Sequence, residues 1–486
     1  MTRTVGRSDD PADGYEGGCE DGVPGSTAAR WRRSVAFGLA GVLALALVPG
    51  VRAHVGGLGG TMEPAAVPTW LVVVTGGGVV GASFLFTSLL TDRGPMHAVA
   101  GARARPTSPR GLAGGLARAG RRAFQLVGLL ALLAVLVAGL VGPLTPTANL
   151  AVLLVWAGWW AGYTMTVYLA ADTWPAVNPW RTLAGLLPSP DREYPARLGA
   201  WPSVVGLLGL VWLEVTSPVT DEPRFLAALV LGYTAVTLAG AATFGREAWF
   251  GAVDPVSRVF RWYGKLAPVR RTDDGLELVV PGAALVETRP DRDDSAFVVA
   301  LLWATTFDGL VSTPPWAAVA GPLVEAGVPS ALLSLVALAA GFGLFYAALV
   351  AASRRSRRTA DTYVTAGHLR RTLAPSLVPI AAGYHLAHYL GYFLGLAPAL
   401  LVALANPLGG AGTPPTLLLP EWFGALRLSF IVLGHLAAVG VAHVVAFETF
   451  PGRLQPIRSQ FPFIVIMIAY TVTSMWIVTQ PYVEPV

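Results

Sequence analysis

The sequence is poor in cysteine and in charge. Its only cysteine among 486 residues, Cys19, lies in a polar N-terminal tail, which excludes a disulfide framework and a thiolate metal site. Only 13% of the residues are charged, where about a quarter is usual for a soluble globular chain. No Walker loop, G-x-S-x-G elbow, H-E-x-x-H motif or GxGxxG fingerprint stands out. Any metal would therefore be bound through nitrogen and oxygen ligands.

Hydrophobic residues are abundant instead. They make up 54% of the chain, and the mean hydropathy is +0.57. An apolar run of about 18 residues or more is long enough to cross a hydrocarbon core roughly 30 Å thick. The sequence thus predicts an all-α integral membrane protein of about 11 transmembrane helices. The predicted spans are 34–51, 69–90, 123–142, 149–170, 200–217, 224–244, 295–313, 328–352, 373–403, 422–447 and 461–479.

Two segments depart from the simple alternation of span and loop. The run at 373–403 is too long for one straight helix, so we expect Pro398 to end or kink it. The loop at 245–294 is too short for an independent domain, and we expect a small hairpin there that covers the inner face.

The arginines set the predicted orientation, because cytoplasmic loops near membrane spans are enriched in Lys and Arg. With the N-terminus inside, only Arg52, Arg224 and Arg427 of the 34 basic residues lie outside the cytoplasmic segments. The chain is then a multi-pass protein of the cell membrane, with lipid bilayer as its surroundings and Val486 outside. Its net charge of +5 reflects this topology and not nucleic-acid binding. The predicted cytoplasmic loops are 91–122, 171–199, 245–294, 353–371 and 448–460.

The N-terminal region has two readings. Residues 1–33 are expected to be a disordered cytoplasmic tail, and residues 34–53 either a signal peptide or the first transmembrane helix of the polytopic domain 54–486. Cleavage after Ala53 would leave 10 spans and make His54 the new amino terminus. Its amine and imidazole would then bind one metal together, as in copper sites of the histidine-brace type. Without cleavage, His54 is an ordinary loop residue.

Several strongly polar residues lie inside predicted spans, where a charge costs about 2.5–3.5 kcal/mol. His385 and His388 share a helix face at i, i+3 and can reach one metal together. His435 or Asp308 would supply a third ligand for zinc, copper or iron. His443 lies about 12 Å from His435 along the helix and cannot join that ion. We expect a structural role for His443 and Glu214.

Polar residues at the cytoplasmic end of the fourth span are expected to be mainly structural. They are Asp172, Asn178, Trp180 and Arg181 in "ADTWPAVNPWRT". Asn178-Pro179 is a turn signal, and Asp172 is expected to pair with a loop arginine.

Six stretches together resemble the prokaryotic membrane proteins commonly labelled fenitrothion hydrolase, over roughly residues 54–480. The label names a synthetic organophosphate ester and implies hydrolase activity, but it brings no site residues with it. The stretches are "NPWRTLAG", "YPARLGAWPSVVGLLGLVWLE", "TTFDGL", "LVPIAAGYHLAHY", "GHLAAVGVAH" and "RSQFPFIVIMIAYTV".

Three functions follow as alternatives. The first is a metal-dependent hydrolase of small apolar esters, with His385, His388 and His435 as zinc or copper ligands, Asp308 as a ligand or base, and Tyr384 or Tyr389 as a hydrogen-bond donor. The second is redox or metal handling, with haem b held axially by His385 and His435, or copper held by His54. The third is a transporter of two five-helix halves, although no internal repeat is visible.

Overall fold

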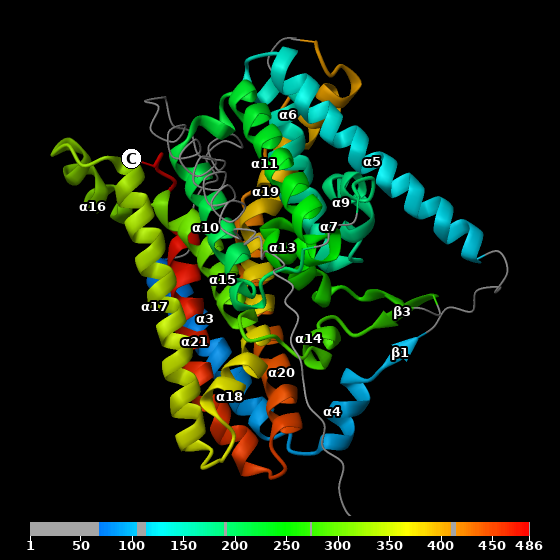
Figure 1. The fold of residues 1–486 in the computed structure, drawn as a ribbon. Coiled ribbons are helices and arrows are strands. Elements are labelled where there is room, and N and C mark those ends of the chain that lie inside the picture. The colour runs from blue at the N-terminus through cyan, green and yellow to red at the C-terminus, as the bar shows by residue number, and fades with distance from the viewer. Residues whose placement is uncertain (1–67, 105–112, 189–191, 273–274, 410–414, 486) are drawn as a thin grey trace, which may run out of the picture. The chain divides into compact units, whose positions relative to one another are not determined.

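The computed structural model describes residues 68–104, 113–188, 192–272, 275–409 and 415–485, and these are largely helical (Figure 1). Within these residues, nine helical segments are long and apolar enough to cross a membrane. They are α3 (Thr69–Ser88), Arg118–Val141 of α5 (Ala113–Val141), Leu150–Leu169, α11 (Pro223–Phe244), α15 (Asp294–Val311), α17 (Ser330–Thr359), Ala366–Ala405, α20 (Phe423–Thr449) and α21 (Leu454–Val478).

The helical membrane class agrees with the sequence prediction, but the number of spans differs. The predicted span 34–51 lies outside the described residues. The predicted span 200–217 is a helix of only 16 residues, α10 (Trp201–Thr216), which is short for a crossing. Proline bounds it at both ends, since Pro202 lies in its first turn and Pro218 follows Ser217.

Two of the segments are composite. Leu150–Leu169 consists of α6 (Leu150–Val152), the π-helix η2 (Leu153–Tyr163) and α7 (Thr164–Leu169). Ala366–Ala405 consists of α18 (Ala366–Leu373), η7 (Ala374–Leu377) and α19 (Val378–Ala405). Of the two expectations for Pro398, the end of the helix is wrong, because Pro398 lies inside α19, and the kink stays a prediction. A proline removes one backbone hydrogen bond, and packing against neighbouring helices tolerates that loss within a membrane.

The shorter elements connect these segments. A three-stranded antiparallel sheet has the order β1 (Arg103–Ala104), β3 (Gly275–Val279) and β2 (Val269–Thr272). Strands β2 and β3 form a hairpin within the loop 245–294, as expected. The remaining helices are α4 (Arg93–Ala100), η1 (Pro146–Ala148), α8 (Trp174–Val177), α9 (Pro179–Ala184), η3 (Ala196–Leu198), η4 (Pro218–Thr220), α12 (Arg246–Ala248), η5 (Trp249–Val253), α13 (Pro255–Tyr263), η6 (Gly264–Leu266), α14 (Ala283–Glu287) and α16 (Pro314–Glu325).

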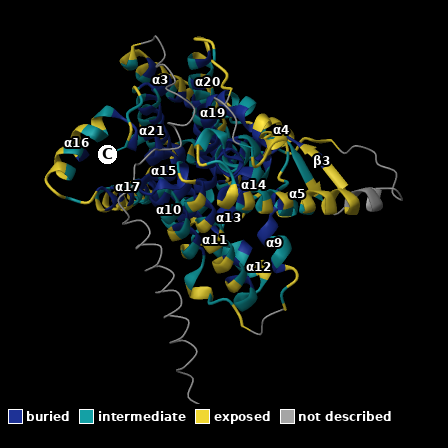
Figure 2. Ribbon diagram, turned by 90° about the horizontal axis from the view of Figure 1, so that it is seen from above, coloured by how far each residue is buried: buried dark blue, intermediate teal, exposed yellow. Residues whose placement is uncertain are grey.

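Helix α15 is the central helix of the described chain. Of its residues, 94% are buried within the protein. The share of buried residues is only 17% in the apolar part of α17 and 28% in that of α3. It packs against α10, α17, α19 and α21, and Figure 2 shows it in the buried region. Residues on α15 are therefore surrounded by other helices and not by lipid.

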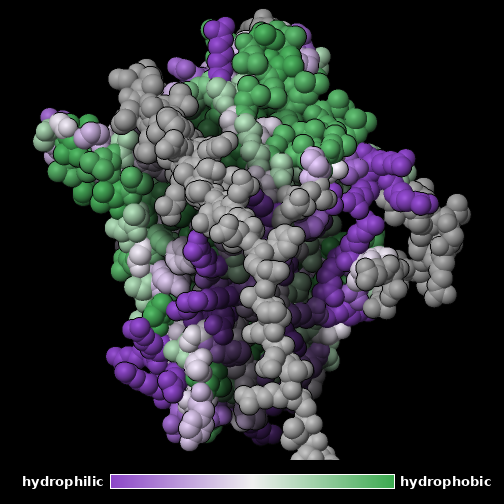
Figure 3. All heavy atoms as spheres, in the orientation of Figure 1, coloured by the Kyte–Doolittle hydropathy of each residue, from purple (hydrophilic) through white to green (hydrophobic). Residues whose placement is uncertain are grey.

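The outer faces of the long helices carry large apolar side chains. Leu130 of α5, Leu344 of α17 and Val465 of α21 are each more than half exposed, and hydrophobic residues gather on the face seen in Figure 3. Exposed apolar surface of this extent suits contact with lipid tails and not with water.

Candidate functional site

Asp308 lies in the last turn of α15 and is buried, with 6% of its surface exposed. Its Oδ2 accepts a hydrogen bond from the Tyr389 hydroxyl at 2.9 Å. The Nε2 atom of His388 is 3.7 Å from the same oxygen, within ion-pair distance. Asp308 is thus brought together with two neighbouring residues of α19, and we call these three residues the Asp308 cluster.

Tyr384 lies one helical turn before His388 on α19. The two rings are nearly parallel, 9° apart, with centroids separated by 6.0 Å. The Tyr384 hydroxyl is buried and has no hydrogen-bond partner among the described residues. It lies against Gly309 of α15, where a Cβ atom would come within 2.1 Å of the hydroxyl oxygen. Tyr384 is therefore beside Asp308, as the predicted donor role requires, but its hydroxyl is not engaged by this part of the chain.

His385 has different hydrogen-bond partners from His388. Its Nε2 lies 3.1 Å from the Trp160 carbonyl, and its Nδ1 lies 3.2 Å from the Tyr168 hydroxyl. A carbonyl only accepts, so Nε2 carries the proton and Nδ1 of the neutral ring accepts from Tyr168. Both ring nitrogens are occupied by the helical segment 150–169. His385 thus joins α19 to the π-helix η2, a wide helical turn of the kind that is often found at functional sites.

The remaining histidines lie apart from the Asp308 cluster. His435 Nδ1 hydrogen-bonds the Ile431 carbonyl one turn earlier in α20, while its Nε2 is buried and finds no partner in the described chain. His443 contacts Gln460 at 3.3 Å and the Leu90 carbonyl at 2.9 Å, so it bridges helices as expected. His54 lies outside the described residues.

The predicted metal set stays a prediction, since His54 lies outside the described residues. Among the described residues, no three His, Cys, Asp or Glu side chains are grouped so that they could hold one metal ion. A spacing of three residues leaves about 60° of divergence around a helix, and the two α19 histidines contact different partners: His385 contacts segment 150–169, and His388 contacts Asp308. The pairing of His385 with His435 as haem ligands meets the same difficulty, since both His385 nitrogens are engaged.

Arg427 is a buried residue for which no role was predicted. It lies near the start of α20 with 8% of its surface exposed, and its Nε donates to the Ala387 carbonyl at 2.9 Å. That bond places Arg427 at the level of α19 that carries His388. The sequence shows that Arg427 is a polar residue within an apolar run, but it does not show that the Ala387 carbonyl is its partner. Tyr168 and Trp160 were also missed, because aromatic residues in a membrane span carry no signal of a polar contact.

The chain after α21 adds polar groups near the same end of α15. The Val483 backbone N–H donates to the Ser312 carbonyl at 2.9 Å, which fastens this segment beside the last turn of α15. Burial raises the pKa of the Tyr482 hydroxyl, and the negative charges of Glu484, Glu214 and Asp308 act in the same direction. Glu214 of α10 and Asp308 are therefore both close to the C-terminal segment.

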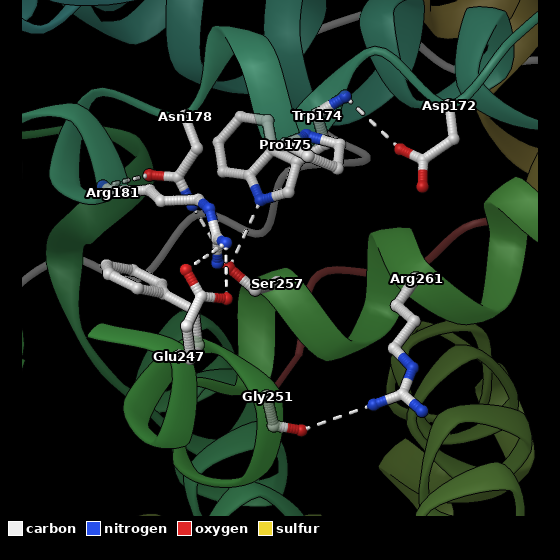
Figure 4. A pocket seen from close by; sticks show the side chains of 10 residues that line it. Asp172, Trp174, Pro175, Asn178, Arg181, Glu247, Gly251, Ser257 and Arg261 are labelled. Carbon is white, nitrogen blue, oxygen red and sulfur yellow. Dashed lines mark hydrogen bonds and ion pairs between the residues drawn. The ribbon is translucent and has the colours of Figure 1, made fainter. Parts of the chain in front are cut away.

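A pocket of about 200 Å³ lies elsewhere, among α8, α9, η5 and α13 (Figure 4). Arg181 contacts both Glu247 oxygens, at 2.6 and 2.7 Å. Asp172 accepts from the Trp174 backbone N–H at 3.2 Å. Asn178 caps α9 as its turn signal indicated. Burial raises the pKa of Asp172 to about 6, and the Trp174 hydrogen bond and Lys265 oppose that rise.

Comparison with known protein families, with curated proteins and with solved structures found no match. The resemblance to proteins labelled fenitrothion hydrolase stays a prediction from the motifs alone. Function must therefore be inferred from the Asp308 cluster itself.

Proposed function

We propose that this chain is a membrane transporter in which the Asp308 cluster binds and releases a proton as a small solute crosses. The observation that carries the proposal is the Asp308 carboxylate, buried in the central helix and contacted by Tyr389 and His388. An ionisable group within a membrane span is costly, and such groups commonly mark ion pathways and proton relays. A purely structural role would be served at lower cost by apolar packing.

The cluster has the chemistry for proton binding. Asp308 and His388 can together hold no proton, one or two, and each step changes the net charge between α15 and α19 by one unit. In a low-dielectric interior such a change is large compared with thermal energy. The Tyr389 hydroxyl donates to the Asp308 carboxylate, and a hydrogen bond to an ionised acceptor is stronger than one to a neutral acceptor. Protonation would thus weaken one of the contacts that join α15 to α19.

The helix opposite α19 supports transport in a second way. Segment 150–169 is π-helical over Leu153–Tyr163, and His385 contacts its Trp160 carbonyl. Irregular backbone within a span is typical of transporter helices that line a solute path. The hydrolase alternative and the haem alternative both require His385 as a ligand, and its engaged nitrogens give them less support.

We also propose the orientation given by the arginines, with residues 354–358 in the cytoplasm and the C-terminus outside. The test uses Cys19→Ser as background, with single cysteines at the exposed positions Arg355 and Glu484. A membrane-impermeant thiol reagent should label Glu484→Cys in intact cells and Arg355→Cys only after lysis. The reverse pattern would refute the orientation.

Proton binding can be tested without knowing the solute. Proteoliposomes adsorbed on a sensor should give a transient charge displacement after a pH step, and Asp308→Asn should abolish it. His443→Gln is the matched control, since His443 is also a buried intramembrane residue but lies apart from the cluster. A wild-type signal no larger than that of protein-free liposomes would refute the proposal. So would a signal that Asp308→Asn leaves unchanged.

A further inference from the structure

Arg427 is a buried cation whose hydrogen-bonding capacity is mostly unused. A guanidinium has five N–H donors, and within the described residues only Nε–H has a partner, the Ala387 carbonyl. Only 8% of the Arg427 surface is exposed. No carboxylate in the described part of the chain lies within ion-pair distance of its guanidinium. An arginine held this way inside a span is unfavourable unless an anion compensates it.

A second unused donor lies nearby. Tyr384 is 2% exposed, and its buried hydroxyl lacks a hydrogen-bond partner among the described residues. The hydroxyl is close enough to Arg427 and to Asp308 for both charges to act on it. A buried hydroxyl without a hydrogen-bond partner is unfavourable. In the described chain, two buried groups on the neighbouring helices α19 and α20, one of them charged, thus carry donors that have no hydrogen-bond partner.

The surroundings of these donors are apolar. Tyr384 packs in a cluster with Ile431 of α20, Met475 and Ile477 of α21 and Val72 of α3. Leu428 and Phe430, which follow Arg427 within one turn of α20, pack against that cluster. A site with a few convergent polar groups in apolar walls suits a ligand that is itself mostly apolar.

We infer that Arg427 and Tyr384 form a binding site for a small monocarboxylate with an apolar body. The guanidinium fork would bind the carboxylate through its terminal nitrogens, and the Tyr384 hydroxyl would donate to one of its oxygens. The claim that this carboxylate is the transported solute rests on the proposed function. The claim that the site binds a carboxylate rests only on the two donors, Arg427 and Tyr384.

The test measures thermal unfolding of the purified full chain in detergent, with butyrate titrated against chloride at constant ionic strength. Butyrate should raise the unfolding midpoint in a saturable way, and neutral butyramide should not. Tyr384→Phe should weaken the apparent affinity about tenfold and Arg427→Gln about a hundredfold. Arg224→Gln, which alters an exposed arginine at the start of α11, should leave it unchanged.

The inference fails if butyrate acts no differently from chloride or butyramide, or if Arg427→Gln still responds fully. Should Arg427→Gln not fold, Arg427→Lys keeps the charge without the fork, and Tyr384→Phe removes only a hydroxyl, so either gives the answer. The pH-step signal distinguishes the two proposals. Its persistence without a butyrate response would overturn the binding site alone, and a butyrate response without that signal would overturn the transport proposal alone.

Discussion

Gly383 of α19 and Gly434 of α20 meet where these two helices cross. Their Cα atoms are so close that a Cβ on Gly383 would lie 3.0 Å from the Gly434 Cα and 2.6 Å from the Phe430 carbonyl oxygen. Small residues at such a crossing allow close helix contact within a membrane. This contact sets the distance between Tyr384, which follows Gly383, and Arg427, two turns before Gly434.

Gly383→Ala should therefore separate α19 from α20, because the added methyl group meets backbone that cannot rotate away. We expect a loss of about 1–3 kcal/mol and a weaker response to butyrate, both measured by thermal unfolding. Gly440→Ala on α20 is the control, since a methyl group there would meet no described atom within 4 Å. Equal behaviour of the two variants would contradict close packing at the crossing.

Gly309→Ala tests the contact between α15 and Tyr384 separately. The new methyl group would lie 2.1 Å from the Tyr384 oxygen and 2.8 Å from a methyl of Ile477. The tyrosine must move, and we expect the pH-step signal to decrease together with the unfolding midpoint. Gly343→Ala in α17, whose Cβ would meet nothing within 4 Å in the described structure, should change neither. A normal signal from Gly309→Ala would mean that the position of Tyr384 does not affect the Asp308 cluster.

The other end of α15 carries a buried ion pair. Asp294 Oδ1 accepts from Arg258 Nη2, and both side chains are nearly inaccessible. Asp294→Asn leaves a buried guanidinium without its counter-charge, and we expect a loss of about 3–5 kcal/mol in unfolding free energy. Glu247→Gln, in the exposed pair with Arg181, should cost about 0–1 kcal/mol. Similar losses in both variants would show that the Arg258 pair is effectively solvated.

Asp172 should give the protein a pH dependence between about 4 and 6. Burial raises its pKa to about 6, so the folded protein binds this proton more tightly than the unfolded chain does. Its contribution to stability is therefore largest below pH 4 and decreases as the pH rises to 6. The Asp172 side chain is exposed, which makes the effect smaller than for a fully buried carboxylate.

The measurement is the difference in unfolding midpoint between wild type and Asp172→Asn, followed from pH 4 to pH 7. Wild type should become less stable relative to the variant as the pH rises to 6, and the difference should then stay constant. Glu325→Gln, at an exposed carboxylate of α16, should show no such trend. A difference that does not vary with pH would mean that the Asp172 carboxyl titrates as it does in water.

Much of the membrane fold follows from the sequence, because hydrophobic runs directly report the length needed to cross a bilayer. The sequence prediction is less accurate where prolines determine the helix ends. Pro398 does not end its helix, while Pro202 and Pro218 shorten α10, and a hydropathy pattern does not separate these cases. Within the site, Asp308 and His388 were predicted to be close and are close.

The partners of the buried groups were harder to predict. His385 and His388 were expected to share one ion. Their side chains leave α19 in different directions, and His385 contacts Trp160 and Tyr168 instead. Spacing along a helix restricts which side chains can meet, whereas rotation of the helix against its neighbours decides which do. That rotation depends on contacts such as Gly383 with Gly434, which a single sequence does not reveal.

The burial of α15 has a consequence for how the protein is made. Tyr389, which donates to Asp308, lies 81 residues further along the chain. At about 5–20 residues per second, Asp308 leaves the ribosome roughly 4–16 s before this partner does. During that interval the carboxylate would be in the insertion machinery or the bilayer without Tyr389 or His388. A ribosome-stalled chain that ends before α19 should thus hold α15 loosely, and its stable insertion would wait for the helix that supplies both contacts.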